Sequence, residues 1–130
     1  KKYILGVGCK KGTDSVKLEV FLRKILEDQG FAIEQLAALA SIDVKKEEAC
    51  LLEFSEKYRI PFLTYPAQEL QAVPGTFHGS EFVKAQVGVD NVCERAAMKA
   101  AGADGRICRA KQAQDGMTVA IAEKAWKVSV

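Results

Sequence analysis

Hydrophobic residues change their spacing abruptly after residue 13. The apolar run from Tyr3 to Val7 is typical of a buried strand, and it ends in a glycine-rich stretch. Residues 14–29 instead place apolar side chains three and four positions apart, which indicates an amphipathic helix that starts at Thr13 or Asp14 and stops before Gly30. A strand that leads directly into a helix favours an α/β fold.

The same alternation continues along the middle of the chain. We expect a helical turn at 32–35, a buried strand at 36–41, a helix at 46–58, a strand at 61–66 and a short helix at 67–72. A turn at Pro74-Gly75 should follow, and then a helix of about two turns between Ser80 and Gly88. The last helix, at 90–101, has an inner face of small alanines and can approach its neighbour closely.

The end of the chain predicts a β-hairpin. Two strand-like runs, 106–113 and 117–122, flank the turn signal Gln114-Asp115-Gly116. Together with the earlier strands and helices, this predicts one α/β domain over residues 1–130. Its expected architecture is three α/β/α layers around a mixed, mostly parallel sheet with a C-terminal antiparallel hairpin.

Charge and cysteine usage exclude several classes of function. The formal net charge is only +2, so composition gives no support for nucleic-acid binding. The apolar runs are too short for a membrane span, which needs ~20 residues. Four scattered cysteines and one histidine lack the spacing of a metal or redox motif, and they fit a reducing cytosol. We therefore expect a cytoplasmic protein that binds neither nucleic acid nor membrane and holds no metal ion itself.

The glycine-rich segment between the first strand and the first helix suits an anion. Backbone N–H groups at a helix N-terminus favour phosphate or carboxylate, and the helix dipole alone contributes about 0.3–1 kcal/mol. The spacing matches neither a Walker loop nor a dinucleotide fingerprint, and a tight turn with solvated lysines explains it equally well. The candidate ligand-binding residues here are Gly8, Cys9, Lys10, Lys11, Gly12 and Thr13.

Polar residues after the second predicted strand form another candidate. Ser41 and Asp43 follow its carboxyl end, where ligands bind in open α/β sheets. Asp43 equally suits a helix cap, so its position alone is weak evidence.

The densest group of ionisable residues lies between Pro74 and Arg95. His78, Glu81 and Glu94 are candidate general bases, although a lone loop histidine is more often a solvated bystander. Candidate substrate-binding residues in this stretch are Thr76, Ser80, Asn91 and Arg95. Cys93 has no neighbouring histidine in the sequence, and burial in the alanine-rich helix is the simpler interpretation.

Four segments in order carry a resemblance to a known family. They are Gly6-Val7-Gly8-Cys9-Lys10-Lys11-Gly12-Thr13, Ala38-Leu39-Ala40-Ser41-Ile42-Asp43-Val44-Lys45, Val73-Pro74-Gly75-Thr76-Phe77 with Ser80-Glu81-Phe82-Val83, and Val87-Gly88-Val89-Asp90-Asn91-Val92-Cys93-Glu94-Arg95-Ala96-Ala97. With the hairpin from Lys111 to Ala122, they resemble the C-terminal domain of the cobalamin-biosynthesis CbiG proteins and the similar stand-alone CobE proteins. The resemblance spans nearly the whole chain.

This resemblance implies a cobalt-precorrin-5A hydrolase of vitamin B12 biosynthesis, which opens a δ-lactone on the corrinoid macrocycle and releases acetaldehyde. It implies no cofactor of the protein's own, because the cobalt belongs to the substrate's ring. The implied partners are a cobalt-precorrin-type tetrapyrrole, the N-terminal and central domains of a parent protein, and methyltransferases of the same pathway.

The sequence leaves two main hypotheses open. The domain contributes catalytic groups to lactone opening, or it only binds or carries the corrinoid as a non-catalytic module. Nucleotide or phosphate binding at the glycine-rich segment is a weaker third hypothesis, because it rests on general helix electrostatics alone.

Overall fold

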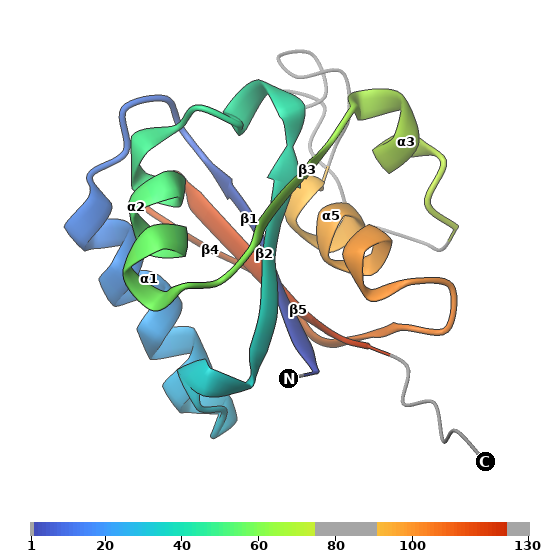
Figure 1. The fold of residues 1–130 in the computed structure, drawn as a ribbon, viewed down its shortest axis with the longest axis horizontal. Coiled ribbons are helices and arrows are strands. Elements are labelled where there is room, and N and C mark those ends of the chain that lie inside the picture. The colour runs from blue at the N-terminus through green and yellow to red at the C-terminus, as the bar shows by residue number, and fades with distance from the viewer. Residues whose placement is uncertain (1, 75–90, 125–130) are drawn as a thin grey trace.

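The computed structural model describes residues 2–74 and 91–124 (Figure 1). The strands are β1 (Tyr3–Cys9), β2 (Leu36–Ile42), β3 (Phe62–Tyr65), β4 (Arg106–Gln114) and β5 (Met117–Glu123). The helices are α1 (Ser15–Gln29), α2 (Ala49–Tyr58), α3 (Ala67–Gln71) and α5 (Val92–Ala101), with short 3-10 helices η1 (Ile33–Gln35) and η2 (Asp43–Lys45). The predicted turn at Pro74-Gly75 and the helix expected from Ser80 lie outside the residues described.

Three boundaries differ from the sequence prediction by two or more residues. β1 continues through Cys9 rather than ending at Val7, so Gly8 also lies within the strand and only residues 10–14 connect it to α1. α5 begins at Val92 rather than at residue 90, after its cap Asn91. α2 begins at Ala49 rather than at residue 46. The preceding segment stays in tight turns because Lys46 and Glu48 donate backbone hydrogen bonds to the carbonyls three residues earlier.

The sheet has the strand order β3-β2-β1-β5-β4. β1 pairs in parallel with β2, and β2 pairs in parallel with β3. β5 runs antiparallel to β1 from Tyr3↔Glu123 to Cys9↔Met117, and β4 runs antiparallel to β5 at the outer edge. The mixed sheet and its C-terminal antiparallel hairpin are therefore confirmed, and β5 runs against the direction of all the other strands described.

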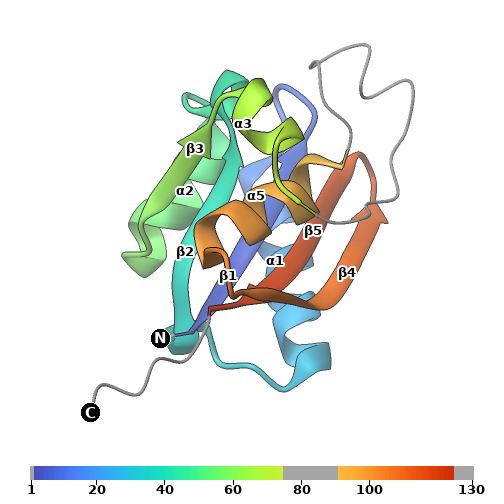
Figure 2. The ribbon, with the colours of Figure 1, turned by 90° about the vertical axis from the view of Figure 1, so that its right-hand side faces the viewer.

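Helices cover both faces of the sheet, which confirms the three-layer architecture. Figure 1 shows α1 and α2 on one face and α3 and α5 on the other, and Figure 2 looks onto the α3 and α5 face. Large apolar side chains, including Leu5, Phe21, Leu22 and Phe54, fill the core beneath α1 and α2. The core beneath α5 is rich in alanine, including Ala40, Ala96, Ala97 and Ala122, which pack with a few larger residues such as Ile4.

Gly6 permits the close approach of α5 to the sheet. A Cβ atom added to Gly6 would lie 1.8 Å from the carbonyl oxygen of Cys93 and 2.8 Å from the Cβ of Ala97. No side chain fits in that space. α5 lies this close to the sheet because Gly6 has no side chain and because α5 presents small alanines to it. This explains a glycine inside a strand.

The hairpin turn has the residues that its backbone requires. Asp115 and Gly116 adopt positive φ angles of 50° and 81° between β4 and β5. A two-residue turn with both residues in this region matches the right-handed twist of the strands, and Asp-Gly is a preferred pair. The predicted hairpin signal is confirmed.

Candidate functional site

Several polar segments meet at one edge of the sheet. The carboxyl ends of β1, β2 and β3 share this edge because the three strands are parallel. The N-terminus of α5 is directed to the same edge, since Cys93 packs near Gly6 and interacts with Thr118, the strand partner of Gly8. Ligands of open α/β sheets bind at such edges. We call this region, formed by residues 10–14, 43–48 and the start of α5, the carboxyl edge.

The loop between β1 and α1 uses its hydrogen-bonding groups internally. The Thr13 hydroxyl and backbone N–H both donate to the carbonyl of Lys10, and the Asp14 carboxylate accepts from the Lys17 N–H as the helix cap. The backbone N–H of Gly12 donates to the Glu48 carboxylate at 3.1 Å. A carboxylate of the protein therefore already lies where the sequence predicted a bound anion.

Two thiols and an ion pair lie behind this loop. The sulfur atoms of Cys9 and Cys50 are 3.7 Å apart, one at the end of β1 and the other in the first turn of α2. Lys45 and Glu48 form an ion pair of 3.8 Å whose side chains are only 15% and 10% exposed. We call Cys9, Cys50, Lys45 and Glu48 the thiol cluster.

The thiol cluster makes its two sulfur atoms chemically different. A hydrogen bond with the Cys50 thiol lowers the pKa of Cys9, and the Lys45 ammonium acts in the same direction against the opposing effect of burial. The same hydrogen bond and burial raise the pKa of Cys50. Cys9 is thus the more nucleophilic partner at neutral pH, and Cys50 retains its proton.

Lys10 and Lys11 bring positive charge to the carboxyl edge. Both side chains are exposed. The aliphatic part of Lys10 packs beside Gly116 in the β4–β5 turn, because a Cβ added to Gly116 would lie 2.8 Å from the Cδ of Lys10. The two ammonium groups suit an anionic ligand that approaches from solvent.

Ser41 and Asp43 differ in accessibility. Ser41 is fully buried, and its hydroxyl donates to the carbonyl of Val7 at 2.7 Å, so it links β2 to β1 beneath the carboxyl edge. Asp43 is half-buried at the start of η2, and its carbonyl accepts the Lys46 N–H. Of the two, only Asp43 is accessible from this edge.

The predicted residues of α5 are held by neighbouring elements. Asn91 caps the helix by accepting the Glu94 N–H at 3.3 Å, and the Arg95 guanidinium donates to the carbonyl of Leu70 at 3.2 Å. The buried Glu94 carboxylate accepts the backbone N–H of Lys111 at 2.7 Å, at an irregularity in the pairing of β4. These contacts give all three residues a role in positioning α5.

The other predicted residues of the polar stretch lie outside the described part of the chain. These are Thr76, His78, Ser80 and Glu81. Their assignment as binding residues or general bases stays a prediction.

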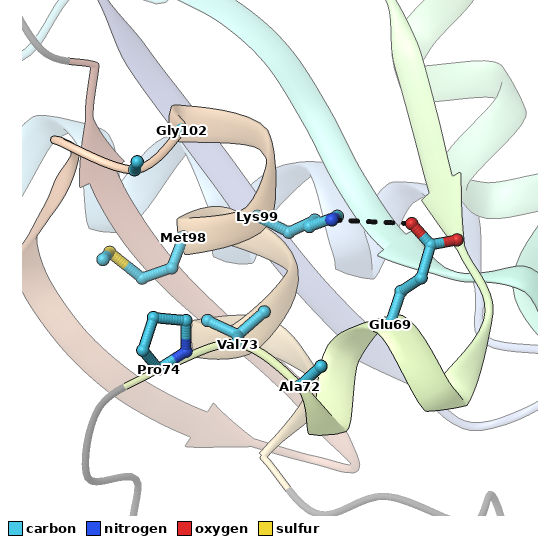
Figure 3. Close-up of a pocket in the computed structure, with 8 residues that line it drawn as sticks. Glu69, Ala72, Val73, Pro74, Met98, Lys99 and Gly102 are labelled. Carbon is cyan, nitrogen blue, oxygen red and sulfur yellow. Dashed lines mark ion pairs between the residues drawn. The ribbon is translucent and has the colours of Figure 1, made fainter.

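A pocket of about 390 Å³ lies away from the carboxyl edge (Figure 3). It lies between α3 and α5 and includes Gly102 and Ala103, at the C-terminal end of α5. Val73, Pro74 and Met98 give it an apolar wall, and Lys99 pairs with Glu69 at 3.5 Å across its mouth. Within the described part of the chain, none of the site residues predicted from the sequence lines this pocket.

The described residues hold neither a metal-binding cluster nor a membrane-spanning helix. Residues 2–74 and 91–124 contain no group of three or more histidine, cysteine, aspartate or glutamate side chains placed to hold a metal ion. Within the same part of the chain, no helix combines the length and hydrophobicity that crossing a membrane requires.

Sequence reasoning missed three members of the thiol cluster as site residues. Lys45 and Glu48 are three positions apart, and this spacing brings side chains together on a helical turn. The sequence could therefore have indicated their ion pair. The contact between Cys9 and Cys50 spans 41 positions of sequence, and no local pattern indicates it.

Comparison with known proteins gives a consistent family assignment. The family described as "Cobalamin synthesis G C-terminus" matches residues 3–122. A cobalt-precorrin-5A hydrolase from Priestia megaterium is 36% identical over 104 residues, which cover 80% of this chain and 28% of that protein. Protein CobE from Sinorhizobium sp is 30% identical over 120 residues, which cover 92% of this chain and 78% of CobE.

A solved structure supports the fold comparison. A crystal structure of CobE, described as a protein from the cobalamin (vitamin B12) biosynthetic pathway, superposes with a TM-score of 0.86. It is 27% identical in sequence, and the match covers 95% of this chain and 90% of the CobE chain. The chain thus corresponds to most of CobE but to less than a third of the hydrolase from Priestia megaterium.

Proposed function

The chain belongs to the family of the cobalamin synthesis G C-terminus, and from this membership we propose that it acts as the C-terminal domain of a cobalt-precorrin-5A hydrolase. Its substrate is a cobalt-containing precorrin, whose δ-lactone is opened with release of acetaldehyde. The observation that carries this proposal is the family match over residues 3–122. This range includes β1, β2 and β3, whose carboxyl ends lie at the carboxyl edge, and the start of α5.

We propose that the carboxyl edge binds the corrinoid. Precursors of this class carry acetate and propionate groups around a flat apolar ring, so their binding site needs cations and N–H donors. Lys10 and Lys11 are exposed at this edge, and Asp43 and Thr13 add polar groups beside them. The cobalt is part of the substrate, and the proposal gives the protein no metal of its own.

Lactone opening needs a base that activates water and donors that stabilise the developing oxyanion. We propose His78 and Glu81 as the general bases. We propose Thr76 and Ser80, which lie close to them in the sequence, as substrate-binding residues. Glu94 is less suited to this role, because the Lys111 N–H already occupies one of its oxygens. Replacement of a true base by alanine should reduce turnover by about 100-fold or more.

The alternative is a non-catalytic module that binds or carries the corrinoid. Two observations favour it: the chain covers 78% of CobE, and the Glu94 carboxylate is engaged in holding β4. In either case we propose that the N-terminal and central regions of a parent hydrolase, together with methyltransferases of the pathway, are its partners. We also propose a reducing, cytoplasmic location, which the four unpaired thiols support.

Corrinoid binding through the lysines is tested by a double variant, Lys10→Ala with Lys11→Ala. We expect the variant to bind a cobalt-precorrin about tenfold or more weakly at low salt, with the difference shrinking as the ionic strength rises. A matched control, Lys24→Ala with Lys124→Ala, removes the same charge from exposed positions away from the carboxyl edge. Equal affinity of both double variants would contradict the assignment of the binding surface.

A further inference from the structure

Cys9 and Cys50 form a pair whose geometry suits reversible oxidation. Their sulfur atoms are 3.7 Å apart, whereas a disulfide bond needs about 2.05 Å, so a small movement of one side chain closes the gap. Cys9 is the last residue of β1, just before the loop 10–14, and Cys50 lies in the first turn of α2. Cys9 thus adjoins the loop 10–14 and Cys50 adjoins the turns at 43–48, and neither lies in the interior of a strand.

The two sulfur atoms have complementary accessibility. Cys9 is half-buried, whereas Cys50 is only 1% exposed, so Cys9 is the partner that solvent reaches more readily. Lys45 stands close enough to act on the charge of Cys9, and it favours the thiolate. An accessible attacking thiol with a protected second thiol behind it is the arrangement of a redox-sensitive dithiol.

The other two cysteines lack this arrangement. Cys93 is fully buried in the first turn of α5, and burial raises the pKa of its thiol to about 12. Cys108 is half-buried on β4, its thiol donates to the carbonyl of Ile121, and burial raises its pKa as well. They serve as internal controls within the same chain.

We propose that Cys9 and Cys50 form a reversible disulfide bond by exchange with a low-molecular-weight disulfide such as oxidised glutathione. The Cys9 thiolate attacks one glutathione sulfur, which forms a mixed disulfide and releases one glutathione thiolate. Cys50 then loses its proton and attacks the sulfur of Cys9, which displaces the second glutathione thiolate. Two protein thiols are oxidised, one glutathione disulfide is reduced to two glutathione thiols, and the protons end on those thiols.

The bond would close a loop of 41 residues and fix the end of β1 to α2. It would therefore tie together the two segments that already share the Gly12–Glu48 hydrogen bond. Cross-links of this kind restrict the unfolded chain, and the melting temperature should rise by on the order of 10 °C. The proposal concerns the thiols alone and does not depend on corrinoid binding.

The test is incubation of the 130-residue chain with oxidised glutathione, followed by alkylation of the remaining thiols and peptide mass mapping. We expect one bond that joins the tryptic peptides 3–10 and 47–57, with Cys93 and Cys108 still alkylated, and full reversal by dithiothreitol. Cys50→Ser should stop at the mixed disulfide on Cys9. Cys9→Ser should leave Cys50 reduced, and Cys108→Ser should behave as the wild type.

Two results would overturn the proposal. One is a mixed disulfide at Cys9 of the wild type that never resolves onto Cys50, and the other is a bond that joins a different pair of cysteines. Because the peptide map of the wild type decides both, the conclusion survives a variant that fails to fold.

Discussion

The carboxylate of Glu48 accepts the backbone N–H of Gly12, with 3.1 Å between the oxygen and the nitrogen. The contact joins the β1–α1 loop to the segment before α2, and the same carboxylate pairs with Lys45. If the proposed corrinoid places a carboxylate at this loop, that carboxylate has to displace Glu48 or bind beside it, at Lys10 and Lys11. On this proposal, Glu48 competes with the anionic ligand.

Glu48→Gln should strengthen corrinoid binding several-fold, because it removes a negative charge near the proposed ligand and keeps an oxygen for the Gly12 N–H. The change also releases Lys45 from its ion pair. Titration of the variant and of Glu47→Gln, an exposed neighbour with the same charge change, measures the effect. Affinity equal to or below that of the Glu47 variant would contradict competition by Glu48.

Glu94→Ala should lower the free energy of unfolding by about 1–3 kcal/mol, because it leaves the Lys111 N–H without its acceptor. Glu94→Gln keeps an acceptor oxygen and should lose less. Urea unfolding of both variants gives the comparison. Glu94→Gln should keep most of its stability in either role, but it should lose turnover only if Glu94 is the catalytic base, so the turnover of this variant separates the two roles.

Gly6→Ala should destabilise the fold by about 1–3 kcal/mol, since the new methyl group would overlap the Cys93 carbonyl and push α5 from the sheet. Gly8→Ala is the matched control on the same strand. There the added Cβ would meet only the Thr118 hydroxyl, at 2.7 Å, and a side chain can rotate away. Equal losses of unfolding free energy in the two variants would contradict the packing argument.

The rate of Cys9 alkylation should rise with pH around a midpoint below that of an ordinary cysteine thiol, because the pKa of Cys9 is lowered by its hydrogen bond with Cys50. The pKa of Cys9 is lowered, so more thiolate is present at neutral pH and the reaction is faster there than at an ordinary thiol. Cys50→Ala removes the hydrogen bond that is the main cause and should move the midpoint upward. Iodoacetamide kinetics with mass detection measure both midpoints, and an unchanged midpoint in the variant would refute this cause.

Hydrophobic spacing predicted most of the fold. The strand at 36–41, the helix at 14–29 and the Asp115-Gly116 hairpin all rest on local patterns, and each is present in the structure. The reason for a glycine at position 6 was not predictable. Gly6 lies in the run that predicts the first strand, but the requirement for glycine comes from the Cys93 carbonyl, 87 positions later in the chain.

The candidate site was less predictable than the fold. Lys10 and Lys11 are exposed at the carboxyl edge, where their position after the first strand predicted them. Ser41 follows the same rule but turns inward to Val7, because side chains alternate along a strand and the sequence does not give the register. The Cys9–Cys50 contact depends on how α2 packs against β1, which only the tertiary structure determines.

The most direct test of the account is a titration of the 130-residue chain with a cobalt-containing precorrin, followed by ultraviolet-visible absorption, with an acetaldehyde assay in the same cuvette. A corrinoid site in this chain should give a saturable change in the corrinoid spectrum at one equivalent of protein. Acetaldehyde release would place catalysis in this domain, and binding without release would identify a substrate-holding module. No spectral change at saturating protein would contradict a corrinoid site within this chain.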